Sequence, residues 1–218
     1  MPDFADLAQK IAVWAIPVLF AITVHEAAHG YVARYFGDDT AARAGRLSLN
    51  PLRHIDPVGT VIVPGVLLML GGFLFGWAKP VPVNFGRLRS PRRDMAIVAG
   101  AGPASNLLMT VIWVSLLWLY FAMGAAPGGW TLFRDMCVAG VTINLILMVL
   151  NLLPLPPLDG GRIAVGLLPD GLARPLASLE RWGLIILIAL LATGLLGKIL
   201  QAPFVFVQTL LYRAFGLI

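Results

Sequence analysis

Long apolar stretches alternate with short polar segments, rich in arginine, along this chain of 218 residues. A helix needs roughly 20 consecutive apolar residues to cross a hydrocarbon core of about 30 Å, and several stretches reach that length. The pattern predicts an all-α polytopic membrane protein with about five to six transmembrane helices. The apolar stretches are residues 7–36, 56–77, 95–123, 137–153, 182–200 and 203–218.

The second stretch, residues 56–77, differs from the others because it is rich in glycine and proline. Positive charge flanks it on both sides, and the positive-inside rule disfavours a single crossing between two such clusters. We therefore expect a re-entrant element or a short β-hairpin after the first helix, with Val81–Phe85 extended and able to offer a strand edge to an unwound substrate. An ordinary span at 58–77 followed by a loop is the alternative. Residues 203–218 are either a further span or an interfacial helix.

Composition supports a membrane protein and argues against other classes. Hydrophobic residues make up 59% of the chain and charged residues only 12%, whereas soluble proteins are about half apolar and a quarter charged. The net charge of +5 comes from cations between the spans, so it indicates topology and no nucleic-acid partner. We expect one membrane-embedded domain over 1–218, with a core at 7–168 and additional membrane helices at 180–218. The sequence carries no signal for oligomeric state.

The first apolar stretch contains His25-Glu26-Ala27-Ala28-His29, an HExxH pattern. Residues i and i+4 share one face of a helix, so His25 and His29 can reach a single cation. Glu26 lies about 100° further round the helix, where its carboxylate can take a proton from water at the metal. Chance matches to this pattern occur, but ionisable groups inside membrane helices are costly and typically functional. The pattern predicts a metalloprotease with Glu26 as general base.

A catalytic zinc site usually has three protein ligands, so one more is needed. His54 is the only other histidine and Cys137 the only cysteine, and we expect His54 to support the site or order its loop without binding metal. The third ligand is therefore expected to be a carboxylate. The candidates in or near apolar stretches are Asp56, Asp94, Asp135 and Asp159.

Asp159 is the favoured candidate because of its surroundings. It follows a span that returns to the membrane face nearest His29, and it lies in a Pro-Pro-Leu-Asp-Gly-Gly turn whose glycines allow close backbone approach. The alternative is that Asp159 only caps the helix that begins near Gly160.

Two motifs together resemble a known family. His25–His29 and the segment Asn151–Gly161 (Asn-Leu-Leu-Pro-Leu-Pro-Pro-Leu-Asp-Gly-Gly) look like the paired motifs of the site-2 protease family of intramembrane zinc metalloproteases. Gly102–Asn106 resembles the helix between them. The resemblance is closest to compact bacterial members without a PDZ or CBS module. It implies one catalytic Zn²⁺ held by His25, His29 and Asp159, with Glu26 as general base.

The resemblance also implies a function and a location. The chain would cleave peptide bonds within or near transmembrane segments of protein or peptide substrates, in regulated intramembrane proteolysis or in clearance of membrane peptides. It would lie in the bilayer of a bacterial inner membrane. The arginine-rich loop after the first helix places the site toward the cytoplasm.

Three asparagines in or beside the apolar stretches have different interpretations. Asn151 is the candidate donor to the oxyanion, with a hydrogen bond between helices as the alternative. Asn106 and Asn144 are interpreted as such structural bonds. Two other functions stay open: a transporter or ion-binding scaffold whose polar groups line a pathway, and a protease-like protein that binds membrane partners without cleaving them.

Overall fold

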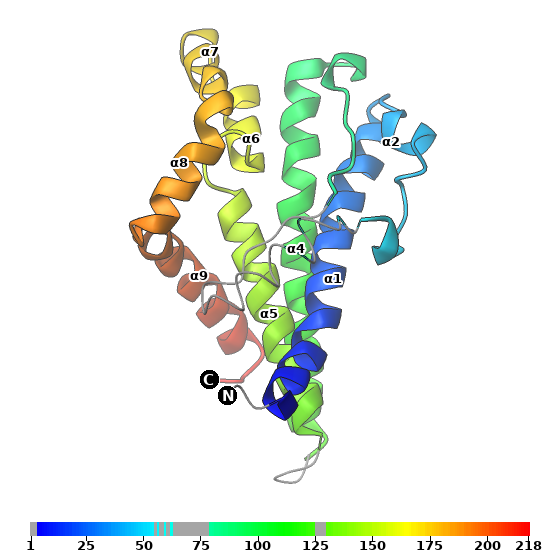
Figure 1. The fold of residues 1–218 in the computed structure, drawn as a ribbon, viewed down its shortest axis with the longest axis vertical. Coiled ribbons are helices and arrows are strands. Elements are labelled where there is room, and N and C mark those ends of the chain that lie inside the picture. The colour runs from blue at the N-terminus through cyan, green and yellow to red at the C-terminus, as the bar shows by residue number, and fades with distance from the viewer. Residues whose placement is uncertain (1–3, 55, 57–58, 60–61, 63–78, 125–129) are drawn as a thin grey trace.

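The computed structural model describes residues 4–54, 56, 59, 62, 79–124 and 130–218. Its regular elements in these residues are helices (Figure 1). Three long helices form the centre: α1 (Phe4–Tyr35), α4 (Pro91–Ala122) and α5 (Thr131–Asn151). The others are α2 (Thr40–Arg43), η1 (Pro51–Arg53), η3 (Phe85–Arg87), α6 (Asp159–Leu167), α7 (Asp170–Ser178), α8 (Glu180–Ala192) and α9 (Leu195–Ala214).

The described residues contain four to five candidate membrane-spanning helices, against the five to six that the hydropathy pattern predicts. Four helices among the described residues, α1, α4, α5 and α9, are long and apolar enough to cross a bilayer. The bent pair α7 and α8, with 65° between its helices, makes a fifth candidate. The predicted class, an all-α polytopic membrane protein, is therefore confirmed.

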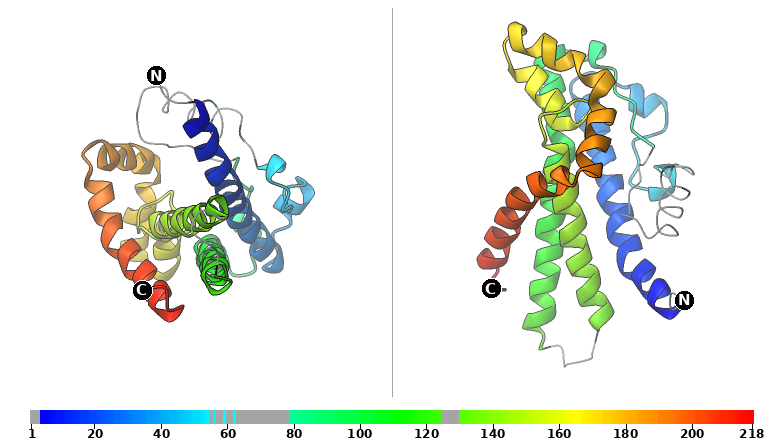
Figure 2. Two further views of the ribbon diagram at one scale, coloured as in Figure 1. Left: turned by 90° about the horizontal axis from the view of Figure 1, so that it is seen from below. Right: turned by 60° about the vertical axis from the view of Figure 1, so that its left-hand side comes forward.

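Helix α4 is the central element of the fold. It packs against α1, α5 and α6, and Figure 2 shows α4 and α5 side by side as an antiparallel pair. The core of this pair contains Trp113 and Val114 from α4 with Val141 and Leu145 from α5. Helix α9 covers the other side of α5. The site described below lies where α1, α4 and α6 meet.

The outer surfaces of the long helices are apolar. Phe20 on α1, Leu108 and Trp118 on α4, and Phe206 on α9 are all exposed. In α9 only 6% of the most apolar window is buried inside the protein. Large exposed apolar surfaces are unfavourable in water, so these faces are suited to contact with lipid.

The C-terminal helices have different boundaries from those predicted. The expected span at 182–200 is divided, because α8 ends at Ala192 and α9 begins at Leu195. Gly194 lies between them with a φ of +71°, a left-handed conformation that ends helices. The marginal stretch at 203–218 is mostly part of α9, which continues through Pro203 because membrane helices tolerate proline.

The region after α1 was expected to hold a re-entrant element or a β-hairpin. Most of residues 58–77 lies outside the described residues. The segment Lys79–Asn84 is non-helical and Asn84 is extended, but the expected extended stretch ends before Phe85, which begins η3. The residues that the structure describes contain no strand. The Lys79 N–H donates to the carbonyl of His54 at 2.9 Å, which fixes one end of the segment to the preceding loop.

The other end of this segment is fixed to the end of α1 by Asp38. The buried Asp38 carboxylate accepts the backbone N–H of Asn84 at 2.6 Å, the backbone N–H of Thr40 at 3.0 Å, and the Thr40 hydroxyl. Burial alone would raise the pKa of Asp38, but these bonds and the charge of Arg87 outweigh it and lower that pKa below its ordinary value.

Asp38→Asn is expected to lower the free energy of unfolding by about 1–3 kcal/mol, because an amide leaves one of the buried donors unpaired. The lowered pKa of Asp38 stabilises the folded state above about pH 3.9, the ordinary pKa of an aspartate. This contribution is lost as the pH falls through the folded-state pKa. Thermal unfolding in detergent at pH 7 and at decreasing pH should show the difference between parent and variant becoming smaller in acid.

The control is Asp39→Asn, since Asp39 pairs with Arg43 and Arg87 at the surface and such pairs contribute little. A difference between the parent and Asp38→Asn that stays constant on acidification would contradict this account of Asp38.

Candidate active site

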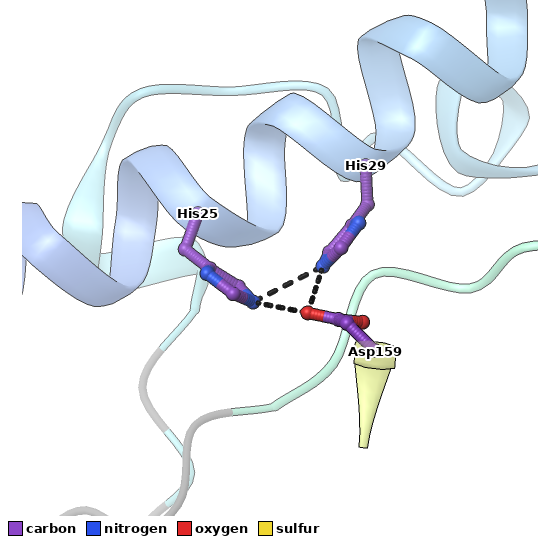
Figure 3. A group of neighbouring side chains, drawn as sticks. All are labelled: His25, His29 and Asp159. Atoms are coloured by element: carbon purple, nitrogen blue, oxygen red, sulfur yellow. Dashed lines mark hydrogen bonds and ion pairs between the residues drawn. The ribbon is translucent and has the colours of Figure 1, made fainter. Parts of the chain in front are cut away.

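Three side chains from two distant parts of the chain converge on one point (Figure 3). His25 and His29 come from α1, and Asp159 is the first residue of α6. The two Nε2 atoms are 3.1 Å apart. Asp159 Oδ2 lies 3.2 Å from Nε2 of His25 and 3.3 Å from Nε2 of His29. These three residues, the ligand cluster below, are the only group of three potential metal ligands found among the described residues.

The partners of the two Nδ1 atoms determine which nitrogen of each imidazole carries the proton. Nδ1 of His29 lies 2.8 Å from the carbonyl oxygen of Val98, and Nδ1 of His25 lies 2.6 Å from Oδ1 of Asn106. Both oxygens only accept hydrogen bonds, so each Nδ1 carries the proton and each Nε2 of a neutral ring carries a lone pair.

The ligand cluster therefore directs two lone pairs and a carboxylate oxygen at each other. Oδ2 of Asp159 is buried without a hydrogen-bond donor. Such an arrangement is repulsive unless a cation lies between the three atoms. Tetrahedral zinc ligands at about 2.0–2.2 Å from the metal are roughly 3.3–3.5 Å from one another, close to the distances observed. The donor set and its spacing fit a zinc ion.

Helix α4 forms the wall behind the two histidines. A Cβ atom on Gly102 would lie 2.5 Å from Nε2 of His29 and from Cε1 of His25, so only glycine permits the rings to rest against this helix. The sequence motif Gly102–Asn106 thus supplies both the close approach and, through Asn106, a hydrogen-bond partner to His25.

The start of α6 holds Asp159 in place. The alternative interpretation of Asp159 as a helix cap is wrong, because Leu158 occupies the N-cap position and Asp159 begins the helix with its side chain turned toward α1. A Cβ on Gly160 would lie 2.3 Å from the carbonyl oxygen of Leu152. The turn between α5 and α6 is therefore tight, as the glycines predicted. A carboxylate in the first turn is also favoured by the helix dipole.

A cavity of about 220 Å³ opens beside the ligand cluster. Glu26 and Asn151 both line it, as does the 79–84 segment. One carboxylate oxygen of Glu26 accepts the backbone N–H of Val81 at 2.7 Å. The side-chain amide of Asn151 donates to the carbonyl of Leu147 at 3.0 Å, a bond within α5 and not the bond between helices that was the alternative to an oxyanion donor. The amide's second hydrogen is not used in that bond.

The other carboxylate candidates lie elsewhere. Asp94 accepts the N–H of Ser90 at 2.7 Å at the start of α4, Asp135 pairs with Arg134, and Asp56 accepts the N–H of Gly59. His54 is buried with Nε2 2.8 Å from the carbonyl oxygen of Ser48, which agrees with the expected loop-ordering role.

Sequence reasoning missed three contacts of the site. Asn106 and Asn144 do bond to each other between α4 and α5 at 3.0 Å, as predicted, but the contact of Asn106 with His25 was not expected. The bond from Val81 to Glu26 involves a backbone group, which no side-chain pattern reveals. Arg162, which lines the cavity and stacks over the ring of Phe85 at 5.3 Å, was also missed, although it follows Asp159 by one helical turn.

Known proteins with similar sequences carry the name of zinc metalloproteases. The sequence model of peptidase family M50 matches residues 129–193. "Putative zinc metalloprotease YwhC" of Bacillus subtilis (strain 168) is 42% identical over 185 residues, which are 83% of this chain and 80% of the relative. No solved structure matches the chain significantly.

Mycobacterial relatives are more distant and longer. "Putative zinc metalloprotease Rip2" of Mycolicibacterium smegmatis is 32% identical over 182 residues, or 83% of this chain and 66% of the relative. The protein of the same name from Mycobacterium tuberculosis (strain H37Rv) is 31% identical over 176 residues, or 79% and 63%.

The fold and the ligand cluster define a multi-pass membrane protein with a site of metalloprotease type. The chain belongs to peptidase family M50. The family and the enzyme class predicted from the sequence, a zinc metalloprotease, are confirmed, and the latter is the class that the relatives' names state.

Gly102→Ala is expected to reduce zinc binding at least tenfold, because the added methyl group would displace both imidazoles from the positions that converge on Asp159. The measurement is zinc affinity of the purified protein by competition with a chelator. The matched control is Gly100→Ala on the same helix, whose Cβ would meet only Ile163 Cδ1 at 4.0 Å. Equal zinc affinities in the two variants would contradict the role of Gly102.

Proposed function

We propose that this chain is an intramembrane endopeptidase that hydrolyses peptide bonds within or near transmembrane segments of membrane proteins or peptides. The observation that carries the proposal is the position of the ligand cluster inside a membrane helix. His25 and His29 lie in the candidate span Ala8–Tyr35, and His25 precedes the end of that span by about 15 Å at 1.5 Å per residue. A peptide bond must come to this depth to be cut.

The residues proposed to hold one zinc ion are His25, His29 and Asp159. When bound, zinc supplies Lewis-acid chemistry, which lowers the pKa of a water ligand to about 7 and polarises a carbonyl group. The chain supplies two neutral imidazoles and one carboxylate, and the burial of Asp159 keeps competing water away from it.

Glu26 is proposed as the general base. It follows His25 directly on α1 and lines the same cavity, so its carboxylate can accept a proton from the attacking water and pass it to the leaving amine. The N–H of Val81 holds one carboxylate oxygen and thereby limits the orientations of the side chain.

Asn151 is proposed to donate a hydrogen bond to the oxyanion. It lines the cavity, and a neutral amide stabilises developing charge without adding a buried ion. Only one of its two amide hydrogens is needed for the bond to Leu147.

Substrates must be locally extended to reach these groups. A transmembrane helix satisfies its own backbone hydrogen bonds and hides its carbonyl carbons among its side chains. The segment Lys79–Asn84 forms one side of the cavity through Pro80, Val81 and Val83. An unwound substrate of transmembrane character is therefore the proposed partner.

The site is proposed to face the cytoplasm of a bacterial cell from the inner membrane. Arg43, Arg46 and Arg53 lie in the loop directly after α1, nearer to the ligand cluster than the amino-terminal end of that helix is. Positive charge of this kind is retained on the cytoplasmic side.

Glu26→Gln is expected to slow cleavage of a model transmembrane peptide in detergent by roughly 10²–10⁴-fold, the usual contribution of a general base. Zinc content should stay at the parent level, because Glu26 is not in the ligand cluster. Asp159→Ala should instead lose both zinc and activity. Mass spectrometry of the products measures cleavage, and metal analysis measures zinc.

Two results would overturn the proposal. Cleavage by Glu26→Gln at the parent rate would remove the general-base mechanism. Absence of cleavage by the zinc-loaded parent, together with ion transport in vesicles that Glu26→Gln retains, would favour a transporter. Zinc binding and peptide binding without either activity would favour a protein that binds its partners and does not cleave them.

Cysteine labelling in intact cells tests the orientation. Leu52 lies in η1 in the segment after α1, and Met123 directly follows α4; both are exposed, whereas the native Cys137 is buried. A membrane-impermeant thiol reagent should label Met123→Cys and spare Leu52→Cys until the membrane is opened. The reverse pattern would invert the proposed topology.

A further inference from the structure

A chain of two side-chain amides connects helix α5 to the ligand His25. Asn144 on α5 donates from Nδ2 to the carbonyl of Gly140 at 2.8 Å. Its Oδ1 accepts from Nδ2 of Asn106 at 3.0 Å, and that Nδ2 also donates to the carbonyl of Ala21 at 3.2 Å. Asn106 Oδ1 then lies 2.6 Å from Nδ1 of His25.

The donor and acceptor in each hydrogen bond of this network follow from the Gly140 carbonyl at one end of it. The Gly140 carbonyl can only accept, so the amide nitrogen of Asn144 must face it and the Asn144 oxygen must face α4. Asn106 therefore presents its nitrogen to two acceptors, Asn144 Oδ1 and the Ala21 carbonyl, and its oxygen to His25. The network thus determines the amide orientations, and His25 must donate from Nδ1.

Burial makes this arrangement costly to reverse. The side chains of Asn106 and Asn144 are fully buried, so water cannot replace a lost partner. A rotation of the Asn106 amide by 180° would place oxygen against two oxygens and nitrogen against the protonated Nδ1. Each unpaired buried group would cost about 1–3 kcal/mol.

We propose that Asn106 and Asn144 are positioning residues that hold His25 in the Nδ1-protonated tautomer before a metal arrives. The Nε2 lone pair is then already directed toward Asp159. His29 reaches the same tautomer by a shorter route, through the backbone carbonyl of Val98. The tautomer of His25 depends instead on the packing of α5 against α4. The consequence for zinc affinity rests on the proposed zinc site, whereas the tautomer itself does not.

Nitrogen-15 NMR of the histidine rings tests the tautomer in the zinc-free protein in detergent. Only three histidines are present, so the ring nitrogens of each can be followed separately. We expect Nδ1–H at His25 and His29. His54 should show the opposite tautomer, because its Nε2 donates to the Ser48 carbonyl. Single His→Gln variants assign the signals.

The variants are Asn106→Leu, which removes the partner of His25, and Asn144→Leu, which touches neither His25 nor Asp159. In both, His25 should shift to a mixture of tautomers while His29 and His54 keep theirs. Zinc affinity, measured by chelator competition, should fall roughly 10–100-fold in Asn106→Leu, the usual effect of losing a hydrogen-bond partner of a ligand, and by a smaller factor in Asn144→Leu.

The matched control is Thr110→Val, which removes a buried hydroxyl from α4. That hydroxyl donates to the backbone carbonyl of Asn106 at 2.8 Å and not to its side chain. It should leave the His25 tautomer and zinc affinity unchanged. If Asn106→Leu does not fold, the His25 tautomer in the parent and in Asn144→Leu still tests the proposal.

An Nε2–H tautomer at His25 in the zinc-free parent would overturn the inference, as would an unchanged His25 tautomer in Asn144→Leu. These results are separable from the fate of the proposed function. A parent with the predicted tautomer that binds no zinc would support the inference and refute the zinc site. Tight zinc binding in all variants with an unchanged His25 would refute the inference alone.

Discussion

The convergence of two imidazole lone pairs and one carboxylate oxygen on a single point is the constraint on which the rest of this structure depends. Three electron-rich atoms within 3.3 Å of each other repel unless a cation joins them. A cation placed there links α1 to the start of α6, two elements far apart in the chain. The proposed zinc ion would therefore couple metal binding to the position of α6 relative to α1, as in other proteins whose ligands come from separate elements.

Helix α4 makes that convergence possible because it packs against the rings of His25 and His29. Its Gly102 leaves room for both rings, and its Val98 carbonyl and Asn106 side chain accept the protons on their far sides. The same helix packs against α1, α5 and α6. In a membrane, where apolar side chains gain little by leaving lipid, small residues and hydrogen bonds provide much of the specificity between helices. Here those contacts also orient the two imidazoles that are proposed to bind the metal.

The sequence predicted the parts of the protein that depend on local pattern. The long apolar helices follow from hydropathy, and His25, Glu26 and His29 follow from helical spacing. Asp159 was favoured over Asp56, Asp94 and Asp135 by the direction of its span and its glycine turn, and the structure brings only Asp159 to the two histidines. The division at Gly194 was missed because hydropathy is continuous across it. The bond from Val81 to Glu26 was missed because a backbone N–H has no signature in sequence.

The 79–84 segment is hydrogen-bonded both to the loop after α1 and to Glu26 beside the ligand cluster. Its Asn84 N–H binds Asp38 beyond the end of α1, and its Val81 N–H binds Glu26 beside the ligand cluster. Both bonds use donors that an extended backbone presents and a helix would use internally. A helical segment at this position could not hold Glu26, the proposed base, through a backbone N–H. Proline at Pro80 and Pro82 favours this non-helical conformation, in which Pro80, Val81 and Val83 line the cavity.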